Sequence, residues 1–298
     1  MLKRLPVDEA ARRVFEVAGP FIPSEGLRAL LSHQVGALVV REFYDKTARE
    51  EILKDIEQVL RSKGNDSESD QVSNWKVSQS DGKLVDSEVD TIGLPLNVAK
   101  GLGKQEEYFA SALKSTRRFR GAARLSPIDK LRLELDEIHP YGCVVGRDET
   151  TRRMHAAGLI RSMKRSSSRG LVHLDDVSEF SSAMGVFSAN IYLQTSLAGG
   201  ELEIWPVTLR SKEQMMEHAL ELGLMTASSA EPEAQRALRE FVLPGPPVLI
   251  VPKPGDLVML CVQRPHAVRG PIHGPRTRLS AQSFVLHEGD GMPLKVEV

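Results

Sequence analysis

The chain has 298 residues, of which 41% are hydrophobic, so it can bury a sizeable core in one large domain or in two small ones. Its 39 basic and 40 acidic residues nearly cancel, and aromatic residues make up only 5%, which argues against nucleic acid or an anionic membrane as a partner. Two cysteines, Cys143 and Cys261, are too few for a disulfide framework or a cysteine-rich zinc site.

The N-terminal sequence contains no apolar segment followed by a cleavage site. No run reaches the roughly 18 consecutive apolar residues that a membrane-spanning helix needs. We therefore expect a soluble, cytoplasmic protein.

The first sixty residues predict a strand and then a helix. Residues 36–43 form a short β-branched run that fits one strand. Asp45 suits a helix N-cap, and an apolar stripe follows it at Ile52, Ile56, Val59 and Leu60. Residues 61–90 are the most polar stretch of the chain, and residues 62–70 predict a solvated surface loop.

A second helix is predicted over residues 125–137. Ser126 suits the N-cap, and Pro127 suits the first helical position, where its missing N–H costs nothing. We expect helical character to continue through residues 151–163.

From residue 170 onward, short apolar runs alternate with turn residues, the sharpest turns being Gly199–Gly200 and Pro254–Gly255. The predicted strands are 171–175, 186–194, 201–207, 248–251, 256–262, 267–269 and 278–287. Short strands at this density indicate an antiparallel barrel or jelly roll. Residues 211–241 are inserted into the series and predict one or two helices, which could form a lid or merely cover a sheet edge.

His173 and Asp175 are two residues apart, and His266 adds a second imidazole from a distant segment. In a strand, residues two apart share a face, whereas on a helix they diverge by about 200°. Two histidines and one carboxylate on one side of an ion, with open positions opposite, are typical of a non-haem Fe(II) site. The pair alone is weak, since some His-x-Asp arises in such a chain with odds of roughly two in five.

Arg278 and Ser280 share one face of the last predicted strand by the same rule. If that face is the barrel interior, the buried guanidinium needs an anion, and a bidentate carboxylate matches its planar fork best. Arg276 has the same parity and is the main rival, but the Arg-x-Ser pairing favours Arg278.

In order and spacing, these segments resemble the Fe(II)/2-oxoglutarate-dependent oxygenases. The resemblance covers residues 170–287 and extends loosely over residues 36–43. It rests on the residues already named and on three further segments: 190–194, 199–202 and the Pro-Gly-Asp turn at 254–256.

The resemblance implies one α+β oxygenase domain over residues 1–298. Its core would be a double-stranded β-helix (jelly roll) over 170–290, with a mainly helical flanking region over 1–169 and a lid-like insertion over 211–241. The implied iron ligands are His173, Asp175 and His266. The implied 2-oxoglutarate ligands are Arg278, Ser280 and Tyr192.

The implied reaction converts 2-oxoglutarate and O₂ into succinate and CO₂ while hydroxylating an unactivated C–H bond of a small metabolite. The helices are similar to those of a branch with aliphatic halogenases and hydroxylases of natural-product pathways. Those halogenases carry Gly or Ala where this chain has Asp175, so the carboxylate favours oxygen insertion over chloride binding.

Desaturation, ring closure and halogenation are alternatives within the same chemistry. A non-catalytic jelly roll that binds a metal and a ligand is an alternative of another class, but it would not need a dicarboxylate clamp. Ordinary packing or surface roles are expected for the remaining candidates, which are Asp176, Glu179, His139, His155, His218, His287, His273, Trp205, Met215 and Met216.

Overall fold

The structure, a computed structural model, describes residues 2–61, 72–77, 84–163, 171–175, 185–209, 212–226, 232–270 and 277–298. Within these ranges the chain has an α+β fold, in which helices surround a large mixed β-sheet and a smaller second sheet. None of the helices in this part of the chain is both long and apolar enough to cross a membrane.

The strands follow one another along nearly the whole chain. They are β1 Val14–Ala18, β2 Ala37–Arg41, β3 Val72–Val77, β4 Leu84–Ile92, β5 Cys143–Val145, β6 Leu159–Met163, β7 Gly185–Gln194, β8 Leu202–Ile204, β9 Val248–Ile250, β10 Leu257–Cys261, β11 His266–Val268, β12 Arg278–His287 and β13 Leu294–Glu297.

The helices lie before β7 or in the insertion between β8 and β9. They are η1 Glu9–Arg12, α1 Ser24–Leu31, α2 Lys46–Arg61, α3 Leu96–Gly101, α4 Gln105–Arg117, α5 Pro127–Ile138, α6 Lys212–Glu217, α7 Ala219–Thr226, α8 Pro232–Ala237 and η2 Leu238–Val242.

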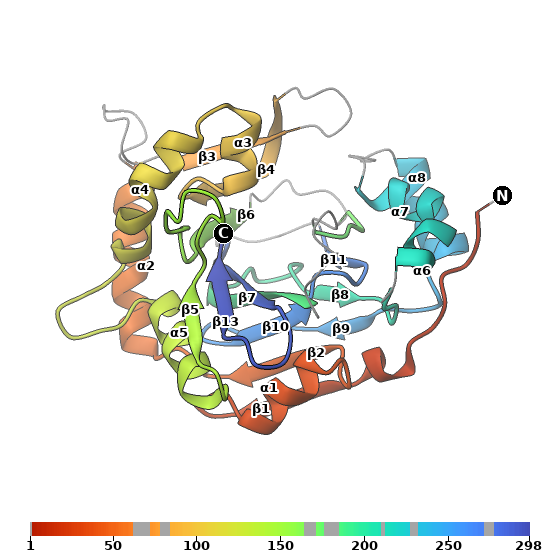
Figure 1. Cartoon of the computed structure of the whole chain (residues 1–298), viewed down its shortest axis with the longest axis horizontal. Helices are drawn as coiled ribbons and strands as arrows, with labels where there is room; N and C mark the ends of the chain where they lie inside the picture. Colours follow the sequence, from red (N-terminus) through yellow and green to blue (C-terminus); the bar gives the residue numbers. More distant parts are fainter. Residues whose placement is uncertain are drawn as a thin grey trace.

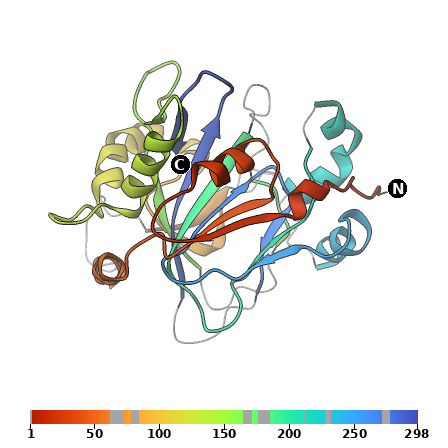
Figure 2. The same ribbon diagram turned by 90° about the horizontal axis from the view of Figure 1, so that it is seen from below.

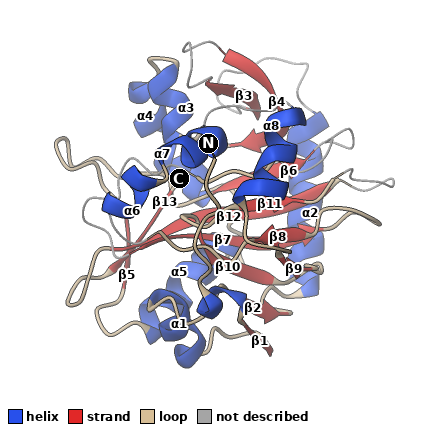
Figure 3. Cartoon of the chain, turned by 90° about the vertical axis from the view of Figure 1, so that its right-hand side faces the viewer, coloured by secondary structure: helices blue, strands red, loops and turns tan. Residues whose placement is uncertain are grey.

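The main sheet has the strand order β1-β2-β10-β7-β12-β6-β4-β3, and its part from β1 to β6 can be followed from bottom to top in Figure 3. Strand β13 pairs with β12, and β5 pairs with β13. The second sheet has the order β11-β8-β9 and is antiparallel throughout. Neighbours in both sheets are therefore mostly distant in sequence, so long-range pairing defines the core.

The two faces of the main sheet pack against different partners, as alternation along β7 shows. Ile191 and Leu193 belong to a large core with residues of α1, α2 and α5, whereas Tyr192 packs with Leu202 and Ile204 of the second sheet. One face of the main sheet is thus covered by helices and the other by the second sheet.

Both predicted helix starts are confirmed. Asp45 Oδ1 accepts from the N–H of Ala48 at 3.0 Å just before α2, and Ser126 Oγ accepts from the N–H of Asp129 at 3.0 Å at the start of α5. Figure 2 shows the other N-terminal helix, α1, beside β1 and β2. A Cβ on Gly26 of α1 would lie only 2.9 Å from a side-chain carbon of Leu38 in β2, so this contact is close.

The helical expectation for residues 151–163 is wrong, because this stretch ends in strand β6. Helix α5 ends at Ile138, and Gly142, with a φ of +74°, turns the chain away from its axis. The sequence of β6, Leu-Ile-Arg-Ser-Met, has only five residues, too few to distinguish the two periodicities. Pairing with β12 and β4 decides the strand.

Other departures concern the flanking region. Strands β1, β3, β4, β5 and β13 were not expected, and β3 and most of β4 lie within residues 61–90, the most polar stretch of the chain. The predicted loop at 62–70 lies outside the described residues. Six of the seven predicted strands from residue 170 onward are present as β7 to β12, with some ends shortened, while residues 171–175 form one bridge, His173 to His266.

The insertion is helical, as expected, and its helices α6, α7 and α8 lie beside β8 and β11 (Figure 1). Helix α7 contributes Leu222 and Met225 to a separate buried cluster, and η2, which follows α8, contributes Leu238. That cluster also contains Val172 and Leu174, from the segment that carries His173. The insertion therefore packs directly behind one of the candidate site segments.

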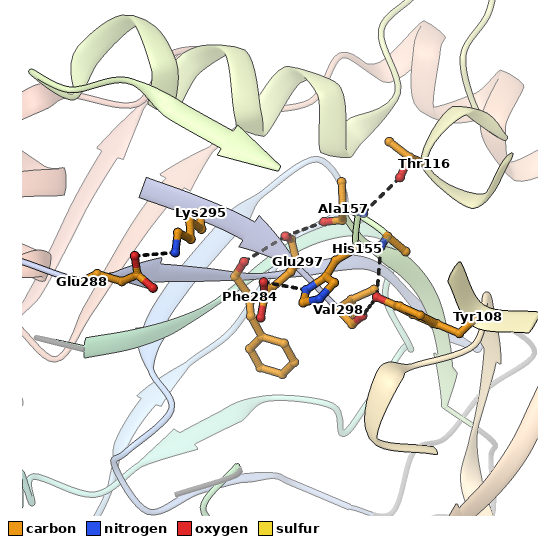
Figure 4. A network of polar contacts seen from close by, with 11 residues as sticks. Tyr108, Thr116, His155, Ala157, Phe284, Glu288, Lys295, Glu297 and Val298 are labelled. Atoms are coloured by element: carbon orange, nitrogen blue, oxygen red, sulfur yellow. Dashed lines mark hydrogen bonds and ion pairs between the residues drawn. The ribbon is translucent and has the colours of Figure 1, made fainter. Parts of the chain in front are cut away.

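A polar network fixes the chain just before β6 (Figure 4). The Tyr108 hydroxyl donates to the carbonyl of Val298 at 2.6 Å and accepts from the N–H of Ala156 at 3.0 Å. The N–H of Ala157 donates to Thr116 Oγ1 at 3.0 Å. These contacts tie the start of β6 to α4 and to the C-terminal residue, so the position of β6 is well determined.

Candidate metal centre

Three side chains that the sequence singled out converge between the two sheets. His173 Nε2 lies 3.7 Å from Asp175 Oδ1, and His266 Nε2 lies 3.6 Å from Asp175 Oδ2. The three ligand atoms all lie within 4.8 Å of one another, the only such cluster of His, Cys, Asp and Glu side chains found in the described ranges.

The backbone brings the two histidines together. The N–H of His173 donates to the carbonyl of His266 at 3.0 Å, and the reverse bond also measures 3.0 Å. Their imidazole centroids are 4.3 Å apart. Asp175 is two residues further on and shares the face of His173, as the spacing predicted.

Both imidazoles have a fixed tautomer that leaves Nε2 available. Nδ1 of His173 donates to the carbonyl of Leu171 at 2.9 Å, and Nδ1 of His266 donates to the carbonyl of Arg264 at 2.9 Å. Outer hydrogen bonds of this kind orient metal-binding histidines and strengthen their basicity at the other nitrogen.

His266 is held neutral. Burial and the neighbouring His173 lower its pKa to about 4, against the opposing effect of Asp175. Histidine must be neutral to bind a metal ion, so His266 is in its ligand form at neutral pH. The His173 side chain, by contrast, is 39% exposed, which leaves this side of the centre accessible.

Arg264 anchors the segment that leads to His266. It is fully buried, and its Nη1 donates to the carbonyls of Val35 and Gly36, both at 2.9 Å, while its Nε donates to Thr208 Oγ1 at 3.0 Å. Because the carbonyl of Arg264 accepts from His266, these contacts also fix the imidazole.

The insertion supports the other ligand segment. Gln235 of α8 accepts from the N–H of Val172 through Oε1 at 2.8 Å, and its Nε2 donates to the carbonyl of Val172 at 3.4 Å. Val172 and Leu174 are buried against the insertion, while His173 and Asp175 face the opposite way. The helices of the insertion therefore support this segment on the side opposite to its two metal-binding side chains.

We predict that Gln235→Ala weakens the affinity for a divalent ion by about tenfold, because supporting contacts to metal ligands typically contribute about 10- to 100-fold. Titration with Mn(II), followed by calorimetry, measures this directly. Glu233→Ala, at an exposed position on the same helix, is the matched control. Equal affinities for the two variants would show that the ligand segment does not need this support.

Arg278, Ser280 and Tyr192 lie next to one another on the same side of the main sheet. Arg278 Nη2 donates to the Tyr192 hydroxyl at 2.8 Å, and its Nη1 lies 3.0 Å from the sulfur of Met163. Arg278 Nε and Ser280 Oγ are buried and have no hydrogen-bond partner within the described part of the chain. The guanidinium is thus buried among neutral groups, as expected of a residue that binds an external anion.

Arg161 is the residue that sequence reasoning missed. It lies on β6 directly opposite Ser280 of β12, and its electrostatic interactions are with Asp175 and Arg278. The five residues of β6 carry no periodicity that could have revealed it, and the helical expectation for residues 151–163 concealed its place on the sheet.

The remaining candidates have the ordinary roles that were expected. His155 interacts with Glu297 at 2.8 Å, Trp205 is buried in the cluster beneath the insertion, and Met215 packs against that cluster. Several named residues lie outside the described ranges, namely Asp176, Glu179, His273 and Arg276.

The donor set fits a divalent transition-metal ion. Two donor atoms on one ion, with bonds of ~2.1 Å, are separated by roughly 3–4 Å. The nitrogen-to-oxygen distances of 3.6 and 3.7 Å agree with this separation. Two imidazoles and one carboxylate suit Fe(II), and three protein ligands leave positions for other molecules.

Solved structures with a similar fold include an N-substituted L-amino acid dioxygenase from Burkholderia ambifaria AMMD, with a TM-score of 0.54 at 15% identity over 92% of this chain and 91% of that chain. Its complex with alpha-KG (2-oxoglutarate) has a TM-score of 0.53 at 14% identity over the same shares. The resemblance inferred from the sequence is confirmed at the level of the fold.

The carbocyclase SnoK from nogalamycin biosynthesis, a non-haem alpha-ketoglutarate-dependent enzyme, has a TM-score of 0.45 at 14% identity over 94% of this chain and 100% of that chain. No protein-family model and no curated protein matches the sequence.

Proposed function

We propose that this protein is an Fe(II)/2-oxoglutarate-dependent dioxygenase that hydroxylates an unactivated C–H bond of a small molecule. The observation that carries the proposal is the convergence of His173, Asp175 and His266, together with the buried Arg278, whose hydrogen-bond partners are neutral. The structural neighbours support it, since one is a dioxygenase with alpha-KG bound.

The strand arrangement supports a double-stranded β-helix as the core. Strands β6, β12, β7 and β10 are adjacent in the main sheet, while β11, β8 and β9 form the second sheet. The bridge between His173 and His266 adds the segment after β6 to the edge of the second sheet. Apart from β8 and β9, which both belong to the second sheet, successive segments thus alternate between the sheets, an arrangement that supports a jelly roll.

In this proposal His173, Asp175 and His266 hold the iron through two Nε2 atoms and a carboxylate. The bound iron and 2-oxoglutarate supply the oxidative chemistry, in which 2-oxoglutarate and O₂ become succinate and CO₂. Arg278 binds the distal carboxylate of 2-oxoglutarate through its planar fork, and Ser280 Oγ donates to the same group. Tyr192 fixes the fork by accepting from Nη2.

Gly200 gives Arg278 the space it needs. Its φ is +87°, and a Cβ there would lie 3.3 Å from Arg278 Cδ and 3.0 Å from Ser196 Oγ. We predict that Gly200→Ala lowers 2-oxoglutarate affinity roughly tenfold, equivalent to ~1.4 kcal/mol.

Gly245→Ala is the control for Gly200→Ala, because Gly245 also has a positive φ, +76°, but no atom within 4 Å of an added Cβ. Both variants bear the cost of a left-handed alanine, about 1–2 kcal/mol. Only Gly200→Ala should change 2-oxoglutarate binding in a calorimetric titration of the metal-loaded protein. If both variants bind 2-oxoglutarate equally well, the space at Gly200 does not matter for the binding of 2-oxoglutarate by Arg278.

The test of the function is Fe(II)-dependent conversion of 2-oxoglutarate into succinate, followed by product mass with a panel of small metabolites in abundant chloride. We expect an oxygenated main product, since Asp175 takes the position that chloride would need. A desaturated or cyclised product would contradict hydroxylation of the substrate but would leave the proposed iron and 2-oxoglutarate chemistry unchanged. A chlorinated main product would overturn Asp175 as a ligand, and metal binding without turnover would favour a ligand-binding protein.

A further inference from the structure

Arg161 lies in the middle of a row of side chains that runs across the main sheet. It is paired with Thr91 of β4 on one side and with Ser280 of β12 on the other, and Ser280 is paired in turn with Tyr192 of β7. Directly paired residues of antiparallel strands point to the same face. Tyr192 packs against the second sheet, so Arg161 is on the face that carries the metal centre.

The guanidinium of Arg161 lacks a matching anion in the described part of the chain. It forms no ion pair there, and its buried Nε has no hydrogen-bond partner. Asp175 attracts it and Arg278 repels it, while the carboxylate oxygens of Asp175 are turned toward His173 and His266. Burial is the main effect, and it lowers the pKa of Arg161. The side chain is therefore a partly buried cation with a buried Nε, and its counter-charge is incomplete within the described part of the chain.

Binding of iron and 2-oxoglutarate would not complete that counter-charge. Arg161, Arg278 and a divalent ion carry four positive charges, while Asp175 and the dicarboxylate carry three negative charges. The imidazole of His266 is neutral. Counted over these described residues and the two bound groups, one positive charge remains, and a charge that is partly removed from water in this way is normally paired.

Building on the proposed function, we infer that Arg161 is a substrate-binding residue, and that the substrate carries a carboxylate that pairs with its guanidinium. The planar fork of arginine can form two parallel hydrogen bonds with a carboxylate, so this contact would orient the substrate and also neutralise the charge of Arg161. Because Arg161 lies near Asp175, it would hold the substrate close to the iron. The substrate class is thus an acidic small molecule.

The test uses pairs of probes that differ in one charge: hexanoate with hexanamide, and N-acetyl-L-leucine with N-acetyl-L-leucinamide. Each is titrated by ligand-observed NMR into the protein loaded with Fe(II) and 2-oxoglutarate, with O₂ excluded. The wild type should prefer at least one acid to its amide. Arg161→Gln should remove that preference, a loss on the order of 10- to 100-fold in acid affinity.

Binding of 2-oxoglutarate, measured on the same variants, separates this inference from the proposed function. The dissociation constant of Arg161→Gln for 2-oxoglutarate should lie within about threefold of the wild-type value, a change of less than half a logarithmic unit. Arg161→Lys keeps the charge but loses the planar fork, so it should retain part of the preference for the acid. If Arg161→Gln does not fold, Arg161→Lys is the variant that tests the inference. Arg153→Gln, at an arginine paired with the exposed Glu106, is the matched control.

Three results would overturn the inference. Wild-type protein could bind none of the acids better than its amide, or Arg161→Gln could keep the full preference. Arg161→Gln could also lose 2-oxoglutarate binding, which would assign Arg161 to the cosubstrate instead. A wild type that binds no 2-oxoglutarate at all would contradict the proposed function itself.

Discussion

His266→Ala should bind Fe(II) or Mn(II) at least about a hundredfold more weakly than the wild type and should not convert 2-oxoglutarate. Loss of a supporting contact alone typically costs about 10- to 100-fold in metal affinity, and loss of a ligand removes a bond to the ion itself. The His266 backbone pairs with His173, and alanine preserves both of those hydrogen bonds. The effect should therefore come from the missing imidazole, with the backbone in place.

Calorimetric titration of the metal, with succinate formation as a second measurement, tests this expectation. His139→Ala is the control, because His139 contacts Tyr141 and His287 and takes no part in the centre. Circular dichroism verifies that both variants are folded. Wild-type affinity and turnover in His266→Ala would exclude His266 as a ligand.

Arg278→Ala should raise the dissociation constant of 2-oxoglutarate by roughly 30- to 3,000-fold, the equivalent of about 2–5 kcal/mol for truncating one member of a buried charged pair. Arg278 is only 6% exposed, and its hydroxyl and thioether partners do not compensate its charge. Removing it leaves the distal carboxylate of the cosubstrate without its cation. Metal affinity in the absence of 2-oxoglutarate should change little.

Arg278→Lys provides the graded comparison, because lysine keeps the charge but cannot form two parallel hydrogen bonds. We expect its 2-oxoglutarate affinity to lie between those of Arg278→Ala and the wild type. Arg276 is the rival on the same strand parity, and it lies outside the described residues. If Arg276→Ala weakens 2-oxoglutarate binding and Arg278→Ala does not, the assignment of the clamp is wrong.

The candidate ligands could be found from the sequence because their signals are local. A separation of two residues places His173 and Asp175 on one face of any extended segment. The same rule groups Arg278 with Ser280. The ligand atoms of His173 and Asp175 lie close together, and Arg278 and Ser280 lie on the side of the main sheet that carries Tyr192. Helix starts at Asp45 and Ser126 were equally local, since a capping side chain bonds an N–H only two or three residues away.

Arg161 shows where local reasoning fails. Five residues of β6 cannot distinguish a strand from a helix end, and the decision comes from β4 and β12, which lie far away in sequence. Strands β1 and β13, at the two ends of the chain, were also missed. Strand β1 pairs in parallel with β2, and β13 pairs with the preceding strand β12 and in parallel with the distant β5.

The sequence by itself thus determined which side chains share a face, where two helices begin and which residues could bind a metal and an anion. Only the tertiary structure decided that the backbone of His266 is bonded to the backbone of His173, that Gln235 of the insertion bonds to Val172, and that Arg161 interacts electrostatically with Asp175. The periodicity of a segment is fixed by its own residues. The neighbour of each strand depends on burial and hydrogen bonding summed over the whole chain.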